Sequence, residues 1–283
     1  MNLYLQPSPP FGRSPIAARG ISHWASILCV FFAMSFGASA GASQELRVAA
    51  AADLQFAFPE LAAQFEKQSG VKLAVTFGSS GNFFAQIQNG APFDLFLSAD
   101  SSYPQRLLEN GFAEPGTLQT YAYGRIVLWL PQDSPLDPSK NGLRTLLDSS
   151  IQKIAIANPE HAPYGRAAVA ALQKAGLYEQ LKNKLVLGEN ISQAAQFAQS
   201  GSAQAGIVAL SLALSPAMRT GKRWEIPADM YPPLQQGVVV VKASRNKDAA
   251  RAFITFLQTD AARAILERNG FSVPAKPVTG GKP

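Results

Sequence analysis

The sequence predicts an α/β protein built from two lobes. Apolar, extended segments alternate with amphipathic helical segments along most of the chain, as in a sheet covered by helices. The alternation runs twice, and β-branched or aromatic segments at residues 125–130 and 238–242 lie where the two series would join. Hydrophobic residues make up 47% of the chain and charged residues 16%, a composition typical of globular rather than disordered proteins.

The first lobe is expected to contain three strands and two helices. The strands lie over residues 46–51, 71–77 and 94–98, and the helices over 54–68 and 83–89. In the first helix, Phe58, Leu61, Ala62 and Phe65 recur at spacings of three and four, which places them on one face. Gly70 follows as a stop signal, so pattern and punctuation agree.

The second lobe repeats this pattern, and the end of the chain returns to the first lobe. Strands are expected over residues 153–157, 184–187 and 205–209, and helices over 165–174 and 192–199. The segments 125–130 and 238–242 are interpreted as two crossing strands of a hinge, followed by C-terminal helices over 248–258 and 261–269. The predicted division is lobe 1 over residues 43–122, lobe 2 over 123–239 and a return to lobe 1 over 240–283.

Residues 1–42 have the features of a secretory signal peptide. Arg13 and Arg19 precede an apolar run at residues 27–36, and small residues suited to cleavage follow at 38–42. The run has about half the length that a bilayer-spanning helix needs. Cys29 lacks the leucine three residues upstream that a lipoprotein signal would show. We therefore expect a cleaved signal peptide and a soluble protein exported to the periplasm.

The composition of the chain after residue 42 excludes much enzyme chemistry. It contains no cysteine and a single histidine, His161, so thiol catalysis, disulfides and Cys/His zinc sites are impossible. A serine hydrolase would have to use His161 as its base. The net charge of +6 for the whole chain is scattered, without a basic cluster that would bind nucleic acid. The sequence thus predicts neither an enzyme nor a cofactor.

Four strand-to-helix junctions share a feature that suits anion binding. Each follows a buried strand and begins a helix, whose first backbone N–H groups have no partner within the helix. The junctions lie at residues 50–54, 78–81, 162–165 and 189–192. Each alone has a plainer explanation, with Asp53 and Asn190 as helix N-caps and 78–81 as a turn. Because ligands of open α/β sheets lie beyond the carboxyl ends of strands, all four are expected to converge on one cleft.

Several of these segments resemble the periplasmic molybdate-binding proteins of ABC importers. The resemblance covers nearly all of the chain after residue 42 and rests on ELRVAAAADL at 45–54, FGSSGNFFAQIQNGAPFDLFLSAD at 77–100, IANPEHAPYGRAA at 156–168 and GIVALS at 206–211. It implies a type II periplasmic binding protein with mixed sheets, which closes on a tetrahedral oxyanion and delivers it to an ABC permease in the inner membrane.

The resemblance also implies which residues contact the anion. Ser80 matches the family serine whose hydroxyl and backbone bind the anion, and Ser79 lies beside it. Tyr164 matches a position that supplies a tyrosine hydroxyl in one branch of the family. Ile191 matches an apolar position that contributes its backbone N–H. Ser80, Tyr164 and Ile191 would touch the oxygens of the anion and would not ligate its metal directly.

Two departures from the family pattern matter. Part of the family has a tyrosine ligand where this sequence has Ala209, a loss that Tyr164 could compensate. Ala52 and Asp53 match the first binding loop, but family members commonly place Ser or Asn at the position of Asp53. A carboxylate about 4 Å from a dianion would cost on the order of 4 kcal/mol at an effective dielectric constant of 20. Asp53 is therefore expected either to cap its helix or to accept a hydrogen bond from a protonated oxyanion such as hydrogen phosphate.

The sequence thus favours a monomeric, exported protein that binds molybdate, and tungstate as well because the two anions are nearly equal in size and charge. A first alternative keeps the binding function but changes the ligand to another oxyanion such as phosphate or sulfate. A second is an exported hydrolase on the same fold with Ser80 as its nucleophile, and a third is a receptor for a membrane sensor.

Overall fold

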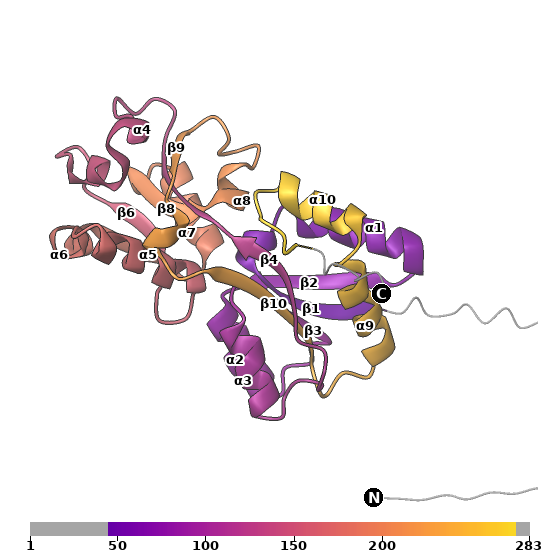
Figure 1. The fold of residues 1–283 in the computed structure, drawn as a ribbon. Coiled ribbons are helices and arrows are strands. Elements are labelled where there is room, and N and C mark those ends of the chain that lie inside the picture. The colour runs from indigo at the N-terminus through magenta and orange to yellow at the C-terminus, as the bar shows by residue number, and fades with distance from the viewer. Residues whose placement is uncertain (1–44, 276–283) are drawn as a thin grey trace, which may run out of the picture. The chain divides into compact units, whose positions relative to one another are not determined.

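The structure is a computed structural model that describes residues 45–275. The predicted signal peptide at residues 1–42 lies outside the described residues. Two five-stranded sheets organise the chain, in the orders β2-β1-β3-β10-β4 and β7-β6-β8-β5-β9 (Figure 1). The prediction of a two-lobed α/β fold with mixed sheets is therefore confirmed.

The first sheet combines parallel strands with one antiparallel strand from late in the sequence. Its strands are β1 (Glu45–Ala51), β2 (Lys72–Gly78), β3 (Leu95–Ser98), β4 (Gln119–Gly124) and β10 (Leu234–Val240). β1 pairs in parallel with β2 and β3, and β10 runs antiparallel to β3 and β4. The carboxyl ends of β1, β2 and β3 consequently meet at one edge of the sheet.

Helices cover both faces of this sheet (Figure 1). They are α1 (Phe58–Ser69), α2 (Ser80–Gln88), α3 (Ser102–Glu109), α9 (Lys247–Phe256) and α10 (Asp260–Arg268). α1, α9 and α10 pack on one face through a buried aromatic cluster that contains Phe58, Phe65 and Phe253. α2 and α3 contribute Phe84 and Tyr103 to a second core on the other face.

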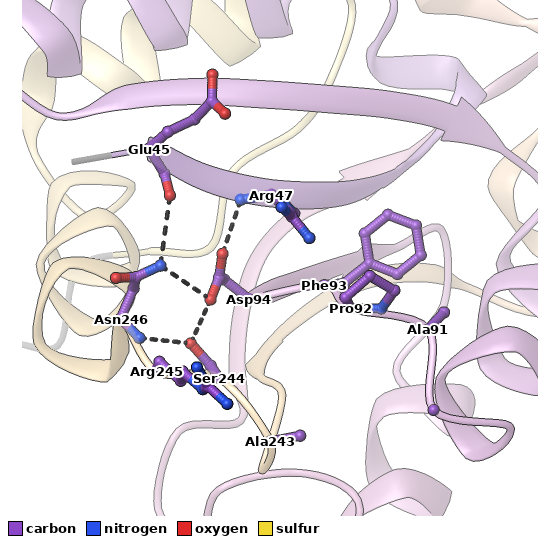
Figure 2. A pocket seen from close by; sticks show the side chains of 11 residues that line it. Glu45, Arg47, Ala91, Pro92, Phe93, Asp94, Ala243, Ser244, Arg245 and Asn246 are labelled. Atoms are coloured by element: carbon purple, nitrogen blue, oxygen red, sulfur yellow. Dashed lines mark hydrogen bonds between the residues drawn. The ribbon is translucent and has the colours of Figure 1, made fainter. Parts of the chain in front are cut away.

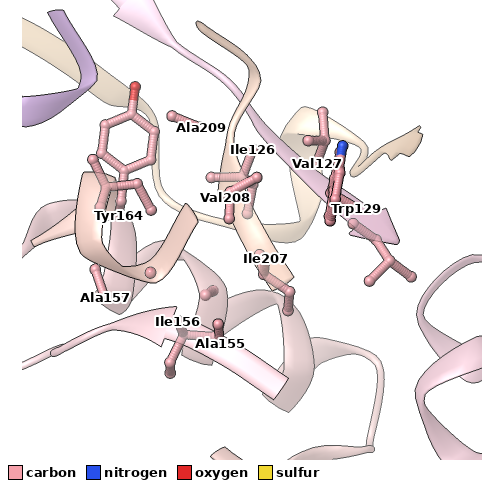
Figure 3. Close-up of a cluster of buried hydrophobic side chains, with 14 of the residues drawn as sticks. Ile126, Val127, Trp129, Ala155, Ile156, Ala157, Tyr164, Ile207, Val208 and Ala209 are labelled. Carbon is pink, nitrogen blue, oxygen red and sulfur yellow. The ribbon is translucent and has the colours of Figure 1, made fainter. Parts of the chain in front are cut away.

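The second sheet lies in the other lobe and has its own core. Its strands are β5 (Ile126–Leu130), β6 (Ile154–Ala157), β7 (Leu185–Gly188), β8 (Ala205–Ala209) and β9 (Lys222–Glu225). The helices around it are α4 (Pro138–Asn141), α5 (Pro163–Lys174), α6 (Tyr178–Leu181), α7 (Ile191–Gln199) and α8 (Leu210–Ala213). Four short 3-10 helices complete the described chain: η1 (Ala52–Leu54), η2 (Gly142–Leu147), η3 (Lys182–Lys184) and η4 (Ala228–Met230). Figure 3 shows part of the core, in which side chains of β5, β6 and β8 pack with Tyr164.

The chain passes between the two sheets twice. It crosses first at Arg125, which alone separates β4 from β5, and again over residues 226–233 between β9 and β10. Each of the strands expected at 125–130 and 238–242 pairs within one sheet only. β10 begins at Leu234, so residues 234–239 belong to the first sheet although the sequence predicts them in the second lobe. The sequence did not predict this first part of the strand because it contains the polar Gln235 and Gln236. A strand is recognised in a sequence by its apolar residues.

Asp94 ties together three segments at the end of the first sheet where β1 begins (Figure 2). Its Oδ2 accepts a hydrogen bond from the Arg47 backbone N–H at 2.8 Å. Its Oδ1 accepts from the Ser244 hydroxyl at 2.5 Å and from the Asn246 amide at 3.3 Å. The Asp94 side chain is almost fully buried. If its carboxylate were removed, the three donors would have no acceptor, because water would not replace it.

Replacing Asp94 with alanine is expected to lower the free energy of unfolding by about 2–4 kcal/mol, because three donors lose a charged acceptor. Ser244→Ala removes one of these bonds and should cost about 1 kcal/mol. Urea unfolding of both variants checks the ratio of the two losses. Equal losses would show that the carboxylate does not hold the three segments together.

Candidate functional site

One small cavity between the lobes collects the residues that the sequence predicts as anion contacts. Its volume is about 10 Å³. The predicted contacts that line it are Ala52, Asp53, Ser79, Ser80, Tyr164 and Ile191. Ala51, Gly78, Ala99, Ala162 and Pro163 complete the lining. The structure thus brings all six predicted positions to one place, with residues from both lobes.

Three helices begin at this cavity. Ser80 is the first residue of α2, Ile191 is the first residue of α7, and Tyr164 is the second residue of α5. Ser79 caps α2 by accepting a hydrogen bond from the Asn82 N–H at 3.4 Å. Asn190 caps α7 by accepting hydrogen bonds from the N–H groups of Ser192 and Gln193, at 3.0 Å each. First-turn N–H groups and helix dipoles of three helices make the cavity favourable for an anion.

The two serines differ in what their hydroxyl groups already do. The Ser80 Oγ accepts a hydrogen bond from the Ala99 N–H at 2.9 Å, and no acceptor for its proton lies among the residues that the structure describes. Ser80 is buried, so the acceptor that its hydroxyl proton can reach is a ligand in the cavity. The Ser79 Oγ instead lies 2.9 Å from Nδ1 of His161, a pairing across the two lobes. Ser80 is therefore the free hydroxyl donor of the pair.

Asp53 is fully buried and does not cap a helix, so that interpretation is wrong. It is the middle residue of η1, and α1 begins five residues after it, behind Ala57 as N-cap. Its Oδ2 accepts hydrogen bonds from the Tyr164 hydroxyl at 2.8 Å and from the Gln236 amide at 2.7 Å. Its Oδ1 is buried without a hydrogen-bond partner among the described residues. The carboxylate therefore joins the two lobes and keeps one oxygen unpaired.

Burial raises the pKa of the Asp53 carboxyl to about 6 from its ordinary value of 3.8. The hydrogen bonds from Tyr164 and Gln236 lower this pKa, and the nearby N–H groups of Asp53 and Leu54 lower it further, but less than burial raises it. No cation contributes to stabilising the charged form. The same burial, with the charge of Asp53 nearby, raises the pKa of Tyr164 well above its ordinary value. The tyrosine therefore stays a neutral donor.

Two residues of this network could not be found from the sequence. Gln236 on β10 donates to Asp53 and also contacts the Tyr164 hydroxyl at 3.3 Å. The Tyr121 hydroxyl on β4 donates to the Gln236 Oε1 at 2.9 Å and so fixes which way the amide faces. The available signal was the polar pair Gln235 and Gln236 directly before the apolar residues 238–240, since buried polar side chains need partners. In this structure the Tyr164 hydroxyl proton is directed to Asp53.

Contacts on both sides of the cavity hold the lobes together. The Gly81 N–H donates to the His161 carbonyl at 2.9 Å, and the Asn82 amide donates to Glu189 at 3.1 Å. The Ser192 hydroxyl donates to Gln55 at 2.5 Å. The two lobes therefore meet in a closed arrangement around the cavity.

Among residues 45–275, no cationic side chain lines this cavity. Arg166 pairs with Asp100 at 2.5 Å and donates to the Tyr103 hydroxyl at 3.2 Å, and Arg125 pairs with Glu225 at 3.2 Å. A larger pocket of about 550 Å³, lined by Arg47 and Arg245, lies at the opposite end of the first sheet, beside the Asp94 network (Figure 2). One helix, α9, begins beside this pocket behind its N-cap Asn246, whereas three helices begin at the small cavity.

Residues 45–275 contain no group of three or more His, Cys, Asp or Glu side chains that could hold a metal ion. Nor is any helix in that range long and apolar enough to span a membrane. The small cavity is therefore the best-supported ligand site in the described part of the chain.

The raised pKa of Asp53 predicts how its charge affects folding. The folded chain binds the proton more tightly than the unfolded chain, so the stabilisation relative to Asp53→Asn is complete below pH 3.8 and lost as the pH rises through about 6. The full difference is about 3 kcal/mol. Urea unfolding of both proteins without ligand, from pH 4 to 7.5, should show wild type losing most of that amount relative to the variant. Parallel curves would contradict the burial of a charged Asp53.

Comparisons with known proteins agree with this geometry. Residues 46–272 match the family described as bacterial extracellular solute-binding protein. The chain is 39% identical over 247 residues to the molybdate-binding protein ModA of Rhodobacter capsulatus, covering 87% of this chain and 94% of that protein. It is 38% identical over 237 residues to ModA of Azotobacter vinelandii, covering 83% and 93%.

Solved structures give the same result for the fold. The periplasmic molybdate-binding protein of Azotobacter vinelandii matches with a TM-score of 0.76 and 36% identity, covering 81% of this chain and 99% of that one. The sulfate-binding protein SubI of Mycobacterium tuberculosis shares only the fold, with a TM-score of 0.66 at 17% identity. These relatives are solute-binding proteins and not enzymes, as the sequence predicts. The chain belongs to the bacterial extracellular solute-binding protein family, together with the molybdate-binding proteins that it matches over most of its length.

Proposed function

We propose that the protein captures molybdate in the cavity between its lobes and delivers it to an ABC permease. The observation that carries this is the meeting of three helix N-termini and the free Ser80 hydroxyl at one small, closed cavity. The names of the relatives that match most of the chain support molybdate as the ligand.

The donors around the cavity suit a dianion without a paired cation. The Ser80 hydroxyl and the backbone N–H groups at Ala52, Ser80 and Ile191 would hold the oxygens of the anion, and Ser79 supports that side of the cavity. Backbone N–H groups at helix starts stabilise negative charge through their partial charges and the helix dipoles. These residues would contact oxygen and not the metal atom.

Selectivity would come from the size of the cavity and the placement of donors. Molybdate and tungstate are nearly equal in size and charge, and both exceed sulfate. A closed set of donors spaced for the larger anions would leave sulfate short of some contacts, and unmade contacts in a dry site are costly. We therefore propose that the site takes molybdate and tungstate alike.

The transport cycle would use the two crossings between the lobes as a hinge. Rotation at Arg125 and within residues 226–233 would open the cavity, and the contacts of Gly81, Asn82 and Ser192 would re-form when the ligand is bound. The permease would recognise the closed form. We propose that the mature protein works in the periplasm after removal of residues 1–42, as a monomer and without a cofactor.

One observation keeps another oxyanion as the second candidate. The unpaired Asp53 Oδ1 could accept a hydrogen bond from an anion that carries a proton, as hydrogen phosphate does. A hydrolase is not supported, because His161 contacts Ser79 and not Ser80, and the family consists of binding proteins.

A panel of oxyanions tests the proposed function directly. Molybdate and tungstate at 1,000 times their dissociation constants should each add about 4 kcal/mol of stability and raise the thermal midpoint of unfolding, whereas sulfate and phosphate should have little effect. A rise with phosphate or sulfate equal to that with molybdate would contradict the assignment.

Ser80→Ala should weaken molybdate binding about 10- to 100-fold, because a hydrogen bond to a charged ligand contributes about 1.5–3 kcal/mol. Calorimetric titration measures the dissociation constant directly. The result therefore does not depend on any stability that the variant loses because the Ala99 N–H has no acceptor. Ser102→Ala is a matched control, since Ser102 begins α3 but is exposed. Equal dissociation constants for wild type and Ser80→Ala would remove Ser80 from the site.

Closure is tested at Gly81, where a Cβ atom would lie 2.7 Å from the His161 carbonyl oxygen of the other lobe. Gly81→Ala should hold the lobes apart and raise the dissociation constant for molybdate at least about tenfold. Asn82→Ala, which removes an interlobe bond without adding volume, should have a smaller effect. Small-angle X-ray scattering with molybdate should show compaction of wild type but not of Gly81→Ala, and compaction of both would contradict this account.

A further inference from the structure

We propose that the cavity binds its dianion together with one proton, which Oδ1 of Asp53 holds and donates to an oxygen of the anion. The inference rests on the proposed function and deepens it. Asp53 would then be a residue that determines which anion is accepted, and the affinity would depend on pH.

The unpaired oxygen is the first observation behind this inference. Within residues 45–275, the buried side-chain atoms without a hydrogen-bond partner are Asp53 Oδ1, Thr145 Oγ1 and Gln258 Nε2. Of these three residues, Asp53 alone carries a charge and alone lines the cavity. Buried polar atoms in folded proteins are nearly always paired. Because Asp53 lines the cavity, a ligand bound there is the partner that its Oδ1 would gain.

The position of the proton follows from the two donors on the other oxygen. Oδ2 accepts from the Tyr164 hydroxyl at 2.8 Å and the Gln236 amide at 2.7 Å. The Gln236 amide cannot turn around without losing the bond that its Oε1 accepts from Tyr121. A proton added to Asp53 must therefore be on Oδ1. A protonated carboxyl group has one O–H to donate, and a fully deprotonated oxyanion can accept it.

In the part of the chain that the structure describes, no neighbouring group offers a positive charge that would make this proton unnecessary. Tyr164 from α5 and Tyr121 from β4 face the carboxylate, and burial raises the pKa of both well above the ordinary value, so both stay neutral. Gln236 from β10 is neutral, and the Ser211 hydroxyl at the start of α8 donates to the Asp53 backbone carbonyl. Across the cavity, α2 contributes Ser80 with Ser79 before it, and His161 contacts Ser79 and not Asp53.

The nearest arginines named above are paired elsewhere. Arg166 pairs with Asp100, and Arg125 with Glu225. A dianion entering the cavity would thus meet a second negative charge with no cation between them. Like charges in one buried site favour protonation of one of them. The dianion keeps its charge when it binds, so the proton is taken up by the Asp53 carboxylate.

The balance of this step is simple. One proton from the solvent forms an O–H bond with Asp53 Oδ1 when one anion binds, and the same bond breaks when the anion leaves. No other bond changes. Burial already brings the pKa of Asp53 to about 6, close enough to neutrality for a bound anion to complete the shift. Above pH 6, the dissociation constant should therefore rise tenfold for each pH unit.

The same proton would discriminate between anions. Molybdate and tungstate carry no proton at neutral pH and would accept the bond from Asp53. Hydrogen phosphate would bring its own proton and donate it to the charged carboxylate, so its binding would take up none. Proton uptake on binding therefore distinguishes an anion that accepts a hydrogen bond from Asp53 from an anion that donates a hydrogen bond to it.

Calorimetric titration with molybdate tests this, in pairs of buffers that differ in ionisation enthalpy, from pH 5.5 to 8.5. Wild type should take up about one proton per anion at pH 8 and less at pH 5.5, with a tenfold rise in the dissociation constant per pH unit above pH 7. Asp53→Asn should take up none and bind with a constant independent of pH. At pH 8, two units above the pKa, it should bind up to about 100-fold more tightly than wild type.

His161→Gln is a control variant, because His161 contacts Ser79 and not Asp53. It should keep the proton uptake of wild type. Uptake that persists in Asp53→Asn but disappears in His161→Gln would overturn the inference. Molybdate binding by wild type without proton uptake would overturn it as well, while leaving the proposed function intact. If wild type does not bind molybdate at any pH tested, the proposed function and this inference both fall.

Discussion

The carboxylate of Asp53 is buried where the two lobes meet, with hydrogen-bond donors from both lobes and no cation from residues 45–275 in contact. Tyr164 on α5 and Gln236 on β10 share its Oδ2, and Tyr121 on β4 orients the glutamine. A buried charge is costly unless it is hydrogen-bonded, so the donors must stay in place while the lobes are closed. The shape of the cavity, the orientation of Tyr164 and the closed arrangement all depend on this one carboxylate.

The cavity beside it would hold an anion without a lysine or arginine from the described residues. Three helices begin there, and their N–H groups are fixed by the fold before any ligand arrives. Donors on two lobes allow the anion to be enclosed only when the lobes meet, which couples capture to the conformation that a permease would recognise. An arginine-lined pocket of larger volume lies at the other end of the first sheet, so volume and charge alone would have pointed to the wrong end.

Much of this arrangement could be predicted from the sequence, because strand-to-helix junctions are local patterns. Residues 78–81 follow β2 of the first sheet, and residues 162–165 and 189–192 follow β6 and β7 of the second. Each segment starts a helix, and all three meet at the cavity between the lobes. The role of Asp53 could not be predicted. An acidic residue before a helical pattern suggests a cap, but here a short 3-10 helix and a turn intervene before α1 begins at Phe58. Gln236 and Tyr121 were missed because a partner 183 or 115 residues away leaves no trace in local sequence.

A crystal structure of the protein grown with molybdate, with the metal located by its anomalous scattering, tests the central claim most directly. The account predicts one peak inside the cavity between Ser80 and Ile191, with an oxygen of the anion about 3 Å from Asp53 Oδ1. A peak beside Arg47 and Arg245, or an anion in the cavity that makes no contact with Asp53, would contradict it.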